Sequence, residues 1–340
     1  PAAAQAPDAK PDLGANAALN YWTAFAILPT LDKDQEKLLE QWNKVPLDAA
    51  ALKLIESSQG SREYLLRGAK FERCDWSLDY TQGIRLLMPH LAKSRLLAPL
   101  AALDARHKFE QGHWKAGAED VTALLKLARH LELEPMMIQQ LVAYGIERTA
   151  IEAAAPYLPE LKSVLSEVAS DVLDVPPTGA TLEQMVLKEK QVGPIWLIQE
   201  LKDAEQRQPG SWRGVWSGLF PAPESPDADF LQPAKTFEQT IKMLEDLVPL
   251  FDELAKMTAL PEREFDAQYS QFVKKRKAGN RLFGLLVPAV GNFVAAERRH
   301  PTQLAMFKAA LSVVQGGPDT LKDIKDPFGD GPFEYRSLDK

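Results

Sequence analysis

Apolar residues recur every three or four positions along most of this chain, which is the spacing that places them on one side of an α-helix. The first such stretch follows Asn16, a favourable N-cap residue, and ends at Pro29. We expect a second helix from Asp32 to Trp42 and a third after Asp48, interrupted near Gly60. The early part of the chain is therefore predicted to be helical.

The helical pattern is strongest between Gln82 and Leu158. Pro89 is expected to open one helix there, and Pro135 to open another, in which four apolar residues form one stripe: Ile138, Leu141, Val142 and Ile146. Short turns between successive helices make them antiparallel neighbours. The pairs resemble tetratricopeptide hairpins but lack the fixed period of about 34 residues that defines that repeat. The predicted fold is all-α: irregular antiparallel helical hairpins in a TPR-like or solenoid-like array.

Capping and helix-breaking residues punctuate the second half of the chain. Two capping boxes, Thr181-x-x-Gln184 and Thr236-x-x-Gln239, each predict the start of a helix. Interruptions or kinks are expected at four places: Pro176-Pro177-Thr-Gly179, Gly193-Pro194, Pro249 and His300-Pro301. Gly316-Gly317-Pro318 is expected to end the helical part.

The segment from Asp326 to Arg336 cannot continue a helix, because it holds two prolines and two glycines within seven residues. Phe333-Glu-Tyr-Arg336 alternates as a strand does, so a short β-type C-terminal tail is predicted. The chain thus divides into five predicted regions: 1–15, a flexible linker after a removed signal; 16–206, an N-terminal helical region; 207–235, a Pro-, Gly- and Trp-rich irregular segment; 236–316, a C-terminal helical region; and 317–340, a turn with the short extended tail.

Composition excludes several classes of protein. Hydrophobic residues make up 45% and charged residues 26% of the 340 positions, and the formal charge is −7, which is ordinary for a soluble globular protein. The negative charge argues against a broad nucleic-acid interface, and no apolar run reaches the roughly 18 residues of a transmembrane helix. Because Cys74 is the one cysteine, we expect no intramolecular disulfide and no cysteine-based zinc cluster.

Residues 1–15 suggest a location outside the cytoplasm. They are rich in proline and alanine, as flexible linkers are. Such a linker often follows a removed signal peptide or a lipid-anchored residue. We therefore expect an exported protein, periplasmic or associated with the envelope, for which direct membrane contact is the less favoured option.

Candidate catalytic residues are sparse. His107, His113 and His130 fall within a window of 24 residues, beside acidic side chains that acid–base or metal chemistry would use. Metal-ligand spacings, nucleophile elbows and phosphate-binding loops are missing from the sequence. The pattern Glu-x-x-His occurs at Glu110 and at Glu297, but each histidine is expected at a helix end, as capping groups are. We assign no catalytic residue, metal ligand or cofactor, and keep as the alternative a hydrolase with a groove site near the three histidines.

An aromatic stripe is the candidate for partner binding. Trp212, Trp216 and Phe220 lie four residues apart, so a short helix would align them. An exposed stripe of this kind would suit a protein interface or, less favourably, a membrane surface. The competing interpretation is that the segment folds back and buries its aromatic rings between helical lobes.

Four stretches resemble a known group of proteins: Asn16–Trp22, Arg73–Tyr80, Leu86–Leu91 and Leu124–Leu131. They are similar to uncharacterised exported helical proteins of planctomycete-type bacteria. The tail from Asp326 to Arg336 resembles the end of type II secretion pseudopilins, in which a short hairpin packs on a helix. A prepilin N-terminal helix is not found in the sequence, so pilus assembly is not implied. The group has no assigned activity, so the resemblance implies no catalytic residue.

The leading functional expectation is therefore non-enzymatic. We expect an exported helical scaffold that binds a protein partner in the cell envelope, through a concave helical face or through the stripe from Trp212 to Phe220. Nucleic acid is not expected as a partner.

Overall fold

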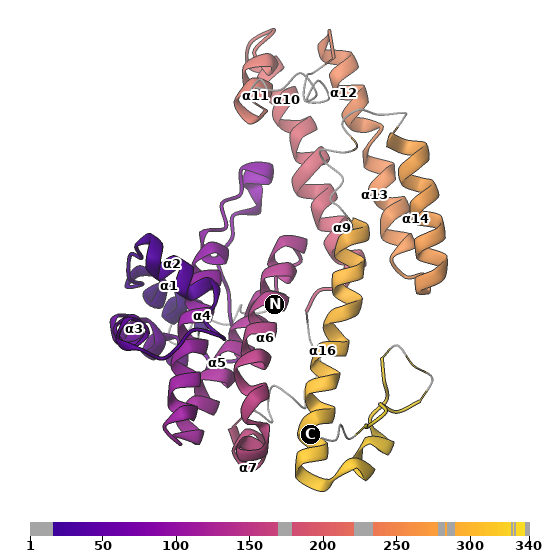
Figure 1. The fold of residues 1–340 in the computed structure, drawn as a ribbon. Coiled ribbons are helices and arrows are strands. Elements are labelled where there is room, and N and C mark those ends of the chain that lie inside the picture. Colours follow the sequence, from indigo (N-terminus) through magenta and orange to yellow (C-terminus); the bar gives the residue numbers. More distant parts are fainter. Residues whose placement is uncertain are drawn as a thin grey trace, which may run out of the picture.

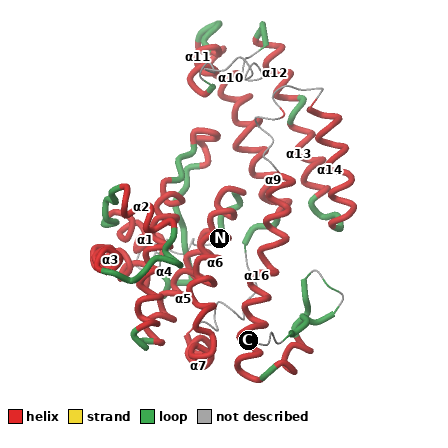
Figure 2. The backbone as a smooth tube through the Cα atoms, viewed as in Figure 1, coloured by secondary structure: helices red, strands yellow, loops and turns green. Residues whose placement is uncertain are grey.

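The computed structural model describes residues 16–168, 179–220, 234–277, 283, 290–327, 329 and 331–336. Within these residues the protein is all-α with antiparallel helix packing, which confirms the predicted class. Figure 2 shows no strand in the described part of the chain, so the predicted β-type tail does not form a strand there. The C-terminal segment forms one antiparallel bridge, between Lys325 and Pro332. The predicted break at Pro176–Gly179 lies almost wholly outside the described residues.

The first three helices start at the side chains that the sequence suggested. Asn16 accepts a hydrogen bond from the N–H of Ala18, Asp32 and Gln35 form a capping box, and Asp48 caps the third helix. The helices of the first lobe are α1 (Ala17–Ala26), α2 (Lys33–Glu40), α3 (Ala49–Gly68), α4 (Pro89–Glu110), α5 (Trp114–Glu132), α6 (Met137–Ala154) and α7 (Leu158–Val168), with short 3₁₀ segments at Tyr80–Arg85 and Ala155–Tyr157.

The second lobe is built from shorter helices. Thr181 and Gln184 form the predicted capping box, and Thr236 accepts a hydrogen bond from the N–H of Gln239. The elements are α9 (Leu182–Lys190), a π-helical turn (Gln191–Ile195), α10 (Trp196–Arg207), α11 (Trp212–Leu219), α12 (Phe237–Glu245), α13 (Val248–Met257) and α14 (Glu262–Lys277), followed by α16 (Val290–Gly316) and a 3₁₀ segment (Pro318–Asp323).

Two apolar cores correspond to the two lobes. In the first core α5 packs against both α4 and α6, and in the second α9 packs against α13. α16 belongs to both cores, because Phe293 lies in the second and Phe307 in the first. Figure 1 shows α16 running from the second lobe down beside α6 and α7. This long helix therefore ties the lobes together through apolar burial, at about 1.5–3 kcal/mol for each large side chain.

The cores do not divide at the predicted region boundary after residue 206. Met185 of α9 and Leu197 and Leu201 of α10 are buried in the second core. Met137 of α6 also lies in the second core, so the described helices do not divide between the two cores at a single point of the chain.

Two predicted helix breaks are wrong. α3 continues through Gly60, where a Cβ atom would lie 3.2 Å from Cδ1 of Ile27, so the glycine makes room for a neighbouring helix. α16 continues through His300-Pro301. An interior proline costs a helix about 3 kcal/mol, which the burial of α16 in both cores offsets.

Other predicted interruptions are confirmed. Gly193 has non-helical dihedral angles inside the π-helical turn, and Gly317, with φ of 83°, follows the end of α16. Pro249 does not kink one long helix. Instead α12 ends at Glu245 and Pro249 lies in the first turn of α13, where a proline leaves no backbone hydrogen bond unmade.

Candidate functional site

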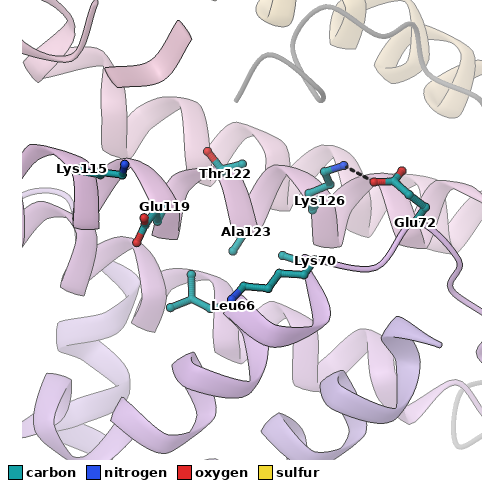
Figure 3. A pocket seen from close by; sticks show the side chains of 9 residues that line it. Leu66, Lys70, Glu72, Lys115, Glu119, Thr122, Ala123 and Lys126 are labelled. Carbon is teal, nitrogen blue, oxygen red and sulfur yellow. Dashed lines mark hydrogen bonds and ion pairs between the residues drawn. The ribbon is translucent and has the colours of Figure 1, made fainter. Parts of the chain in front are cut away.

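A groove of about 480 Å³ lies between α5 and the C-terminal part of α3 (Figure 3). This volume is within the range of small-molecule sites. The lining combines small aliphatic side chains with lysines and glutamates. We call it the α3/α5 groove, and its lining residues are Leu66, Ala69, Lys70, Glu72, Lys115, Glu119, Thr122, Ala123 and Lys126.

A buried ionic network joins α3 and α5 through residues that neighbour the groove lining in sequence. Arg62 of α3 contacts Asp104 of α4 (Nε to Oδ2, 2.7 Å) and Asp120 of α5 (Nη1 to Oδ1, 3.0 Å). Lys108 of α4 forms ion pairs with the same two carboxylates. Two cations and two anions therefore hold three helices together in the interior, where losing one partner would leave a charge unpaired.

The carboxyl group of Asp120 is fully buried in this network. Burial raises its pKa to about 6, although the nearby Lys108 and Arg62 favour the charged form. The charge of the network therefore changes in mildly acidic solution.

A second ion pair lies in the lining of the α3/α5 groove. The ammonium group of Lys126 is 3.1 Å from Oε1 of Glu72, which follows α3. The Lys126 side chain is nearly buried, whereas that of Glu72 is 87% exposed. The lysine stem thus packs against protein while its charge meets solvent at the groove.

Two charged side chains that line the groove form no ion pair with another described side chain. Within the described part of the chain, neither the Lys70 ammonium nor the Glu119 carboxylate makes a side-chain hydrogen bond or ion pair. Lys115 pairs with Glu167 at 2.9 Å, but both side chains are more than half exposed. Exposed pairs of this kind contribute little free energy, about 0–1 kcal/mol. A bound ligand can therefore replace Glu167 as the partner of Lys115.

A second, apolar groove lies between α2, α4 and α6. We call it the α2/α4/α6 groove, and its lining residues are Leu39, Trp42, Arg95, Ala98, Pro99, Leu141, Val142, Gly145, Ile146 and Thr149. Its volume is about 260 Å³. Gly145 leaves it open, because a Cβ atom added there would meet nothing within 4 Å.

The predicted stripe on α6 is only partly buried. Val142 and Ile146 lie in the first core, as expected. Ile138 is 38% and Leu141 40% exposed, and Leu141 lines the apolar groove. Sequence reasoning missed this groove, although Pro99 and Gly145 inside helical patterns were signals that the helices pack loosely there.

The three histidines of the hydrolase alternative do not share a cleft. His107 is half-buried near the end of α4, and His113 is exposed just before α5. His130 lies some 17 positions further along α5, about 25 Å at 1.5 Å per residue, and is buried. Burial, followed by the charge of Lys126, lowers the pKa of His130 to about 4. The arrangement supplies no geometric support for that alternative.

Sequence analysis did not single out His90, although it is the most deeply buried histidine of the described chain. Its ring stacks on Trp76, with centroids 4.6 Å apart, and Nε2 lies 3.2 Å from Oε1 of Gln139. Burial lowers its pKa. His90 and His130 are therefore neutral members of the first core.

The two Glu-x-x-His patterns do not gather around a common centre. Glu110 is the last residue of α4 and pairs with Arg106, while His113 lies beyond the helix end. Glu297 lies within α16, and the side chain of His300 is outside the described part. Among the described residues, no three histidine, cysteine, aspartate or glutamate side chains are arranged to hold a metal ion.

The aromatic stripe lies on α11. Trp212 and Trp216 are buried in the second core, and Phe220 is half-buried with its ring centroid 4.9 Å from that of Trp216. Partner binding by these three residues stays a prediction. The burial of both indoles does not support it, because a protein interface needs exposed anchors.

Comparison with known proteins gives no family or relative: no family model, no curated protein and no solved structure matches this chain. Within the described residues, no helix has the length and apolar character needed to cross a membrane. The α3/α5 groove and the α2/α4/α6 groove are therefore the candidate binding sites.

Proposed function

We propose that this chain is an exported helical protein that binds another protein in the cell envelope, with the α2/α4/α6 groove as its binding surface. The observation that carries the proposal is the exposure of Leu141 in an apolar hollow that includes Trp42, with the exposed Ile138 one turn earlier on α6. Anchors of a partner protein typically enter apolar pockets of this kind, where they are fully removed from water.

The charges around the groove support a partner with an acidic residue near its apolar anchor. Arg95 lines the groove and is exposed, and its guanidinium makes no hydrogen bond or ion pair with any other described side chain. An arginine at the edge of an apolar contact can hold a carboxylate through two parallel hydrogen bonds. The groove therefore offers one charged contact beside an otherwise apolar surface.

The architecture is consistent with this role. We take the stacked hairpins of α3 to α6 as an irregular, solenoid-like array, a type of body that binds proteins along the surfaces between its helices. We also propose that the tail near Asp326 has a structural role only, as an end of the chain similar to that of pseudopilins. Export and envelope location rest on the composition of residues 1–15 and on the family resemblance.

A photo-crosslinking experiment in the native host tests the groove. A benzoylphenylalanine at Leu141 should crosslink a specific envelope protein. The same group at Leu52 of α3 is the matched control, because both side chains are 40% exposed. Adding Gly145→Phe should fill the groove and remove the adduct, whereas Gly145→Ala should preserve it, since a single methyl group enters open space. Identical adducts at both positions, or an adduct at Leu141 that survives Gly145→Phe, would contradict the proposal.

A further inference from the structure

We infer that the α3/α5 groove is a binding site for a small monocarboxylate that carries a short apolar group. This site lies on different helices from the α2/α4/α6 groove and does not depend on the proposed protein-binding function. Its ligand class follows from the shape of the hollow, from what holds it open and from the balance of charges around it.

Ion pairs hold the two walls of the hollow. Arg62 and Asp120 join α3 to α5 in the interior, and Lys126 of α5 pairs with Glu72 at the groove. Small side chains, Ala69 among them, line the space where larger ones would fill it. A site whose walls are held apart before binding loses less free energy on binding than one that must first open.

The lining charges suit one negative charge. Three lysines and two glutamates border the groove, so its formal balance is +1. Lys70 extends along the groove in Figure 3, and its ammonium group makes no hydrogen bond or ion pair with other described side chains. Lys115 is held by an exposed pair with Glu167, which an incoming carboxylate can replace. The Lys70 ammonium group thus supplies donors for one carboxylate, with Lys115 as a further cation of the lining.

The remaining residues define the rest of the ligand. Leu66, Ala69 and Ala123 offer aliphatic contact next to Lys70, which favours an apolar group attached close to the carboxylate. Glu119 also lines the groove and would repel a second negative charge. Dicarboxylates and phosphate esters are therefore disfavoured relative to monocarboxylates.

Two sources could supply this chemistry, the C-terminus of a peptide and a free aliphatic acid. N-acetyl-leucine represents the first and hexanoate the second. N-acetyl-leucinamide is the matched control, because it keeps the shape of N-acetyl-leucine and lacks the negative charge. We expect dissociation constants on the order of 1 mM for ligands of this size, so binding is measured by NMR titration of the whole protein with ¹³C-methylated lysines.

We expect N-acetyl-leucine to shift the Lys70 and Lys115 resonances in a saturable manner, and N-acetyl-leucinamide to leave them unchanged. Lys70→Gln should weaken binding about threefold, the size of one exposed charge contact. Lys53→Gln, on the exposed side of the same helix, is the control with the same charge change and should have no effect. Because Lys70 is exposed, its replacement does not disturb the core.

The outcomes separate the sources and can overturn the inference. Saturable binding of N-acetyl-leucine alone identifies a peptide C-terminus, and binding of hexanoate alone identifies a free aliphatic acid. Binding of both supports the shared carboxylate chemistry. Equal binding of the amide, equal loss with Lys53→Gln, or no saturable shift up to about 50 times the expected 1 mM constant would show that the groove is not a carboxylate site.

Discussion

Tyr21 and His130 lie 109 residues apart in the sequence and meet inside the first core, where the Tyr21 hydroxyl oxygen is 2.8 Å from Nδ1 of His130. Trp76 stacks on Tyr21 and donates its indole N–H to the backbone carbonyl of His130. Burial, with a further contribution from Lys126, holds the pKa of His130 near 4, so its imidazole is neutral at pH 7 and Nδ1 accepts a hydrogen bond from the Tyr21 hydroxyl. One polar contact thus joins α1 to α5.

Tyr21→Phe is expected to lower the free energy of unfolding by about 1–3 kcal/mol, because Nδ1 of His130 would be left buried without its partner. Urea unfolding followed by circular dichroism measures the change. Tyr64→Phe is the matched control, since Tyr64 is only half-buried and its hydroxyl makes no hydrogen bond within the described structure. Equal losses in the two variants would argue against the role of the Tyr21–His130 contact.

Two glycine-to-alanine changes in helices should have opposite effects. At Gly68 a Cβ atom would lie 2.5 Å from Cε1 of the buried Tyr21, so Gly68→Ala should destabilise the protein by about 1–3 kcal/mol. At Gly145 the same atom meets nothing within 4 Å, so Gly145→Ala should stabilise α6 by about 1 kcal/mol. Thermal unfolding of both variants measures this, and a shift of the same sign in both would show that the packing around one glycine is not as described.

Arg62→Met is expected to cost about 3–5 kcal/mol, because it leaves Asp104 and Asp120 buried beside a single remaining cation, Lys108. Arg67→Met, one turn further along α3, removes an exposed pair with Glu63 at 4.0 Å and should change stability by less than about 1 kcal/mol. Chemical unfolding at pH 7 compares the two. A small loss for Arg62→Met would mean that the network contributes no more than surface pairs do.

Two buried groups should make stability depend on pH in opposite directions. The pKa of His130 is about 4 in the folded protein against an ordinary 6.5, so its contribution to stability is complete above pH 6.5 and is lost as pH falls toward 4. The pKa of Asp120 is about 6 against an ordinary 3.8, so its contribution is complete below pH 3.8 and is lost as pH rises toward 6. Each pKa shift changes the free energy of unfolding by at most about 3 kcal/mol.

Asp120→Asn tests this opposition, because asparagine keeps the shape and removes the titration. The free energy of unfolding should then rise more steeply between pH 4 and 6 than in the unmodified protein, about 1 kcal/mol per pH unit more. The measurement is a series of urea unfolding curves across that range. Asp34→Asn, an exposed change on α2, is the control. An unchanged slope in Asp120→Asn would show that Asp120 does not gain a proton in the folded state.

Local features of the sequence predicted most of the helices correctly, because they act within one or two turns. Asp32 with Gln35 and Thr181 with Gln184 form capping boxes in the structure, and Gly317 follows the last long helix. Gly60 was predicted wrongly for the same reason. A prediction from neighbouring residues counts only the conformational cost of the glycine. It cannot include the contact with Ile27, which packs against Gly60 from the end of α1.

The candidate sites depended on contacts that no local pattern encodes. Asp104 and Lys108 are four residues apart and could be paired from the sequence, but Arg62 and Asp120 reach them only through the packing of three helices. The four-residue spacing of aromatic residues that begins at Trp212 indicated an aromatic stripe. This spacing did not show whether the stripe was exposed.

The sequence by itself determined the helical class, the capped helix starts and the absence of known catalytic motifs, since periodicity and capping are properties of neighbouring residues. Only the tertiary structure decided that Trp212 is buried, that His130 is a neutral core residue, and that two grooves remain open beside Lys70 and Gly145. Exposure and pairing depend on which helix faces are brought together, and residues more than 50 positions apart in the chain make those contacts.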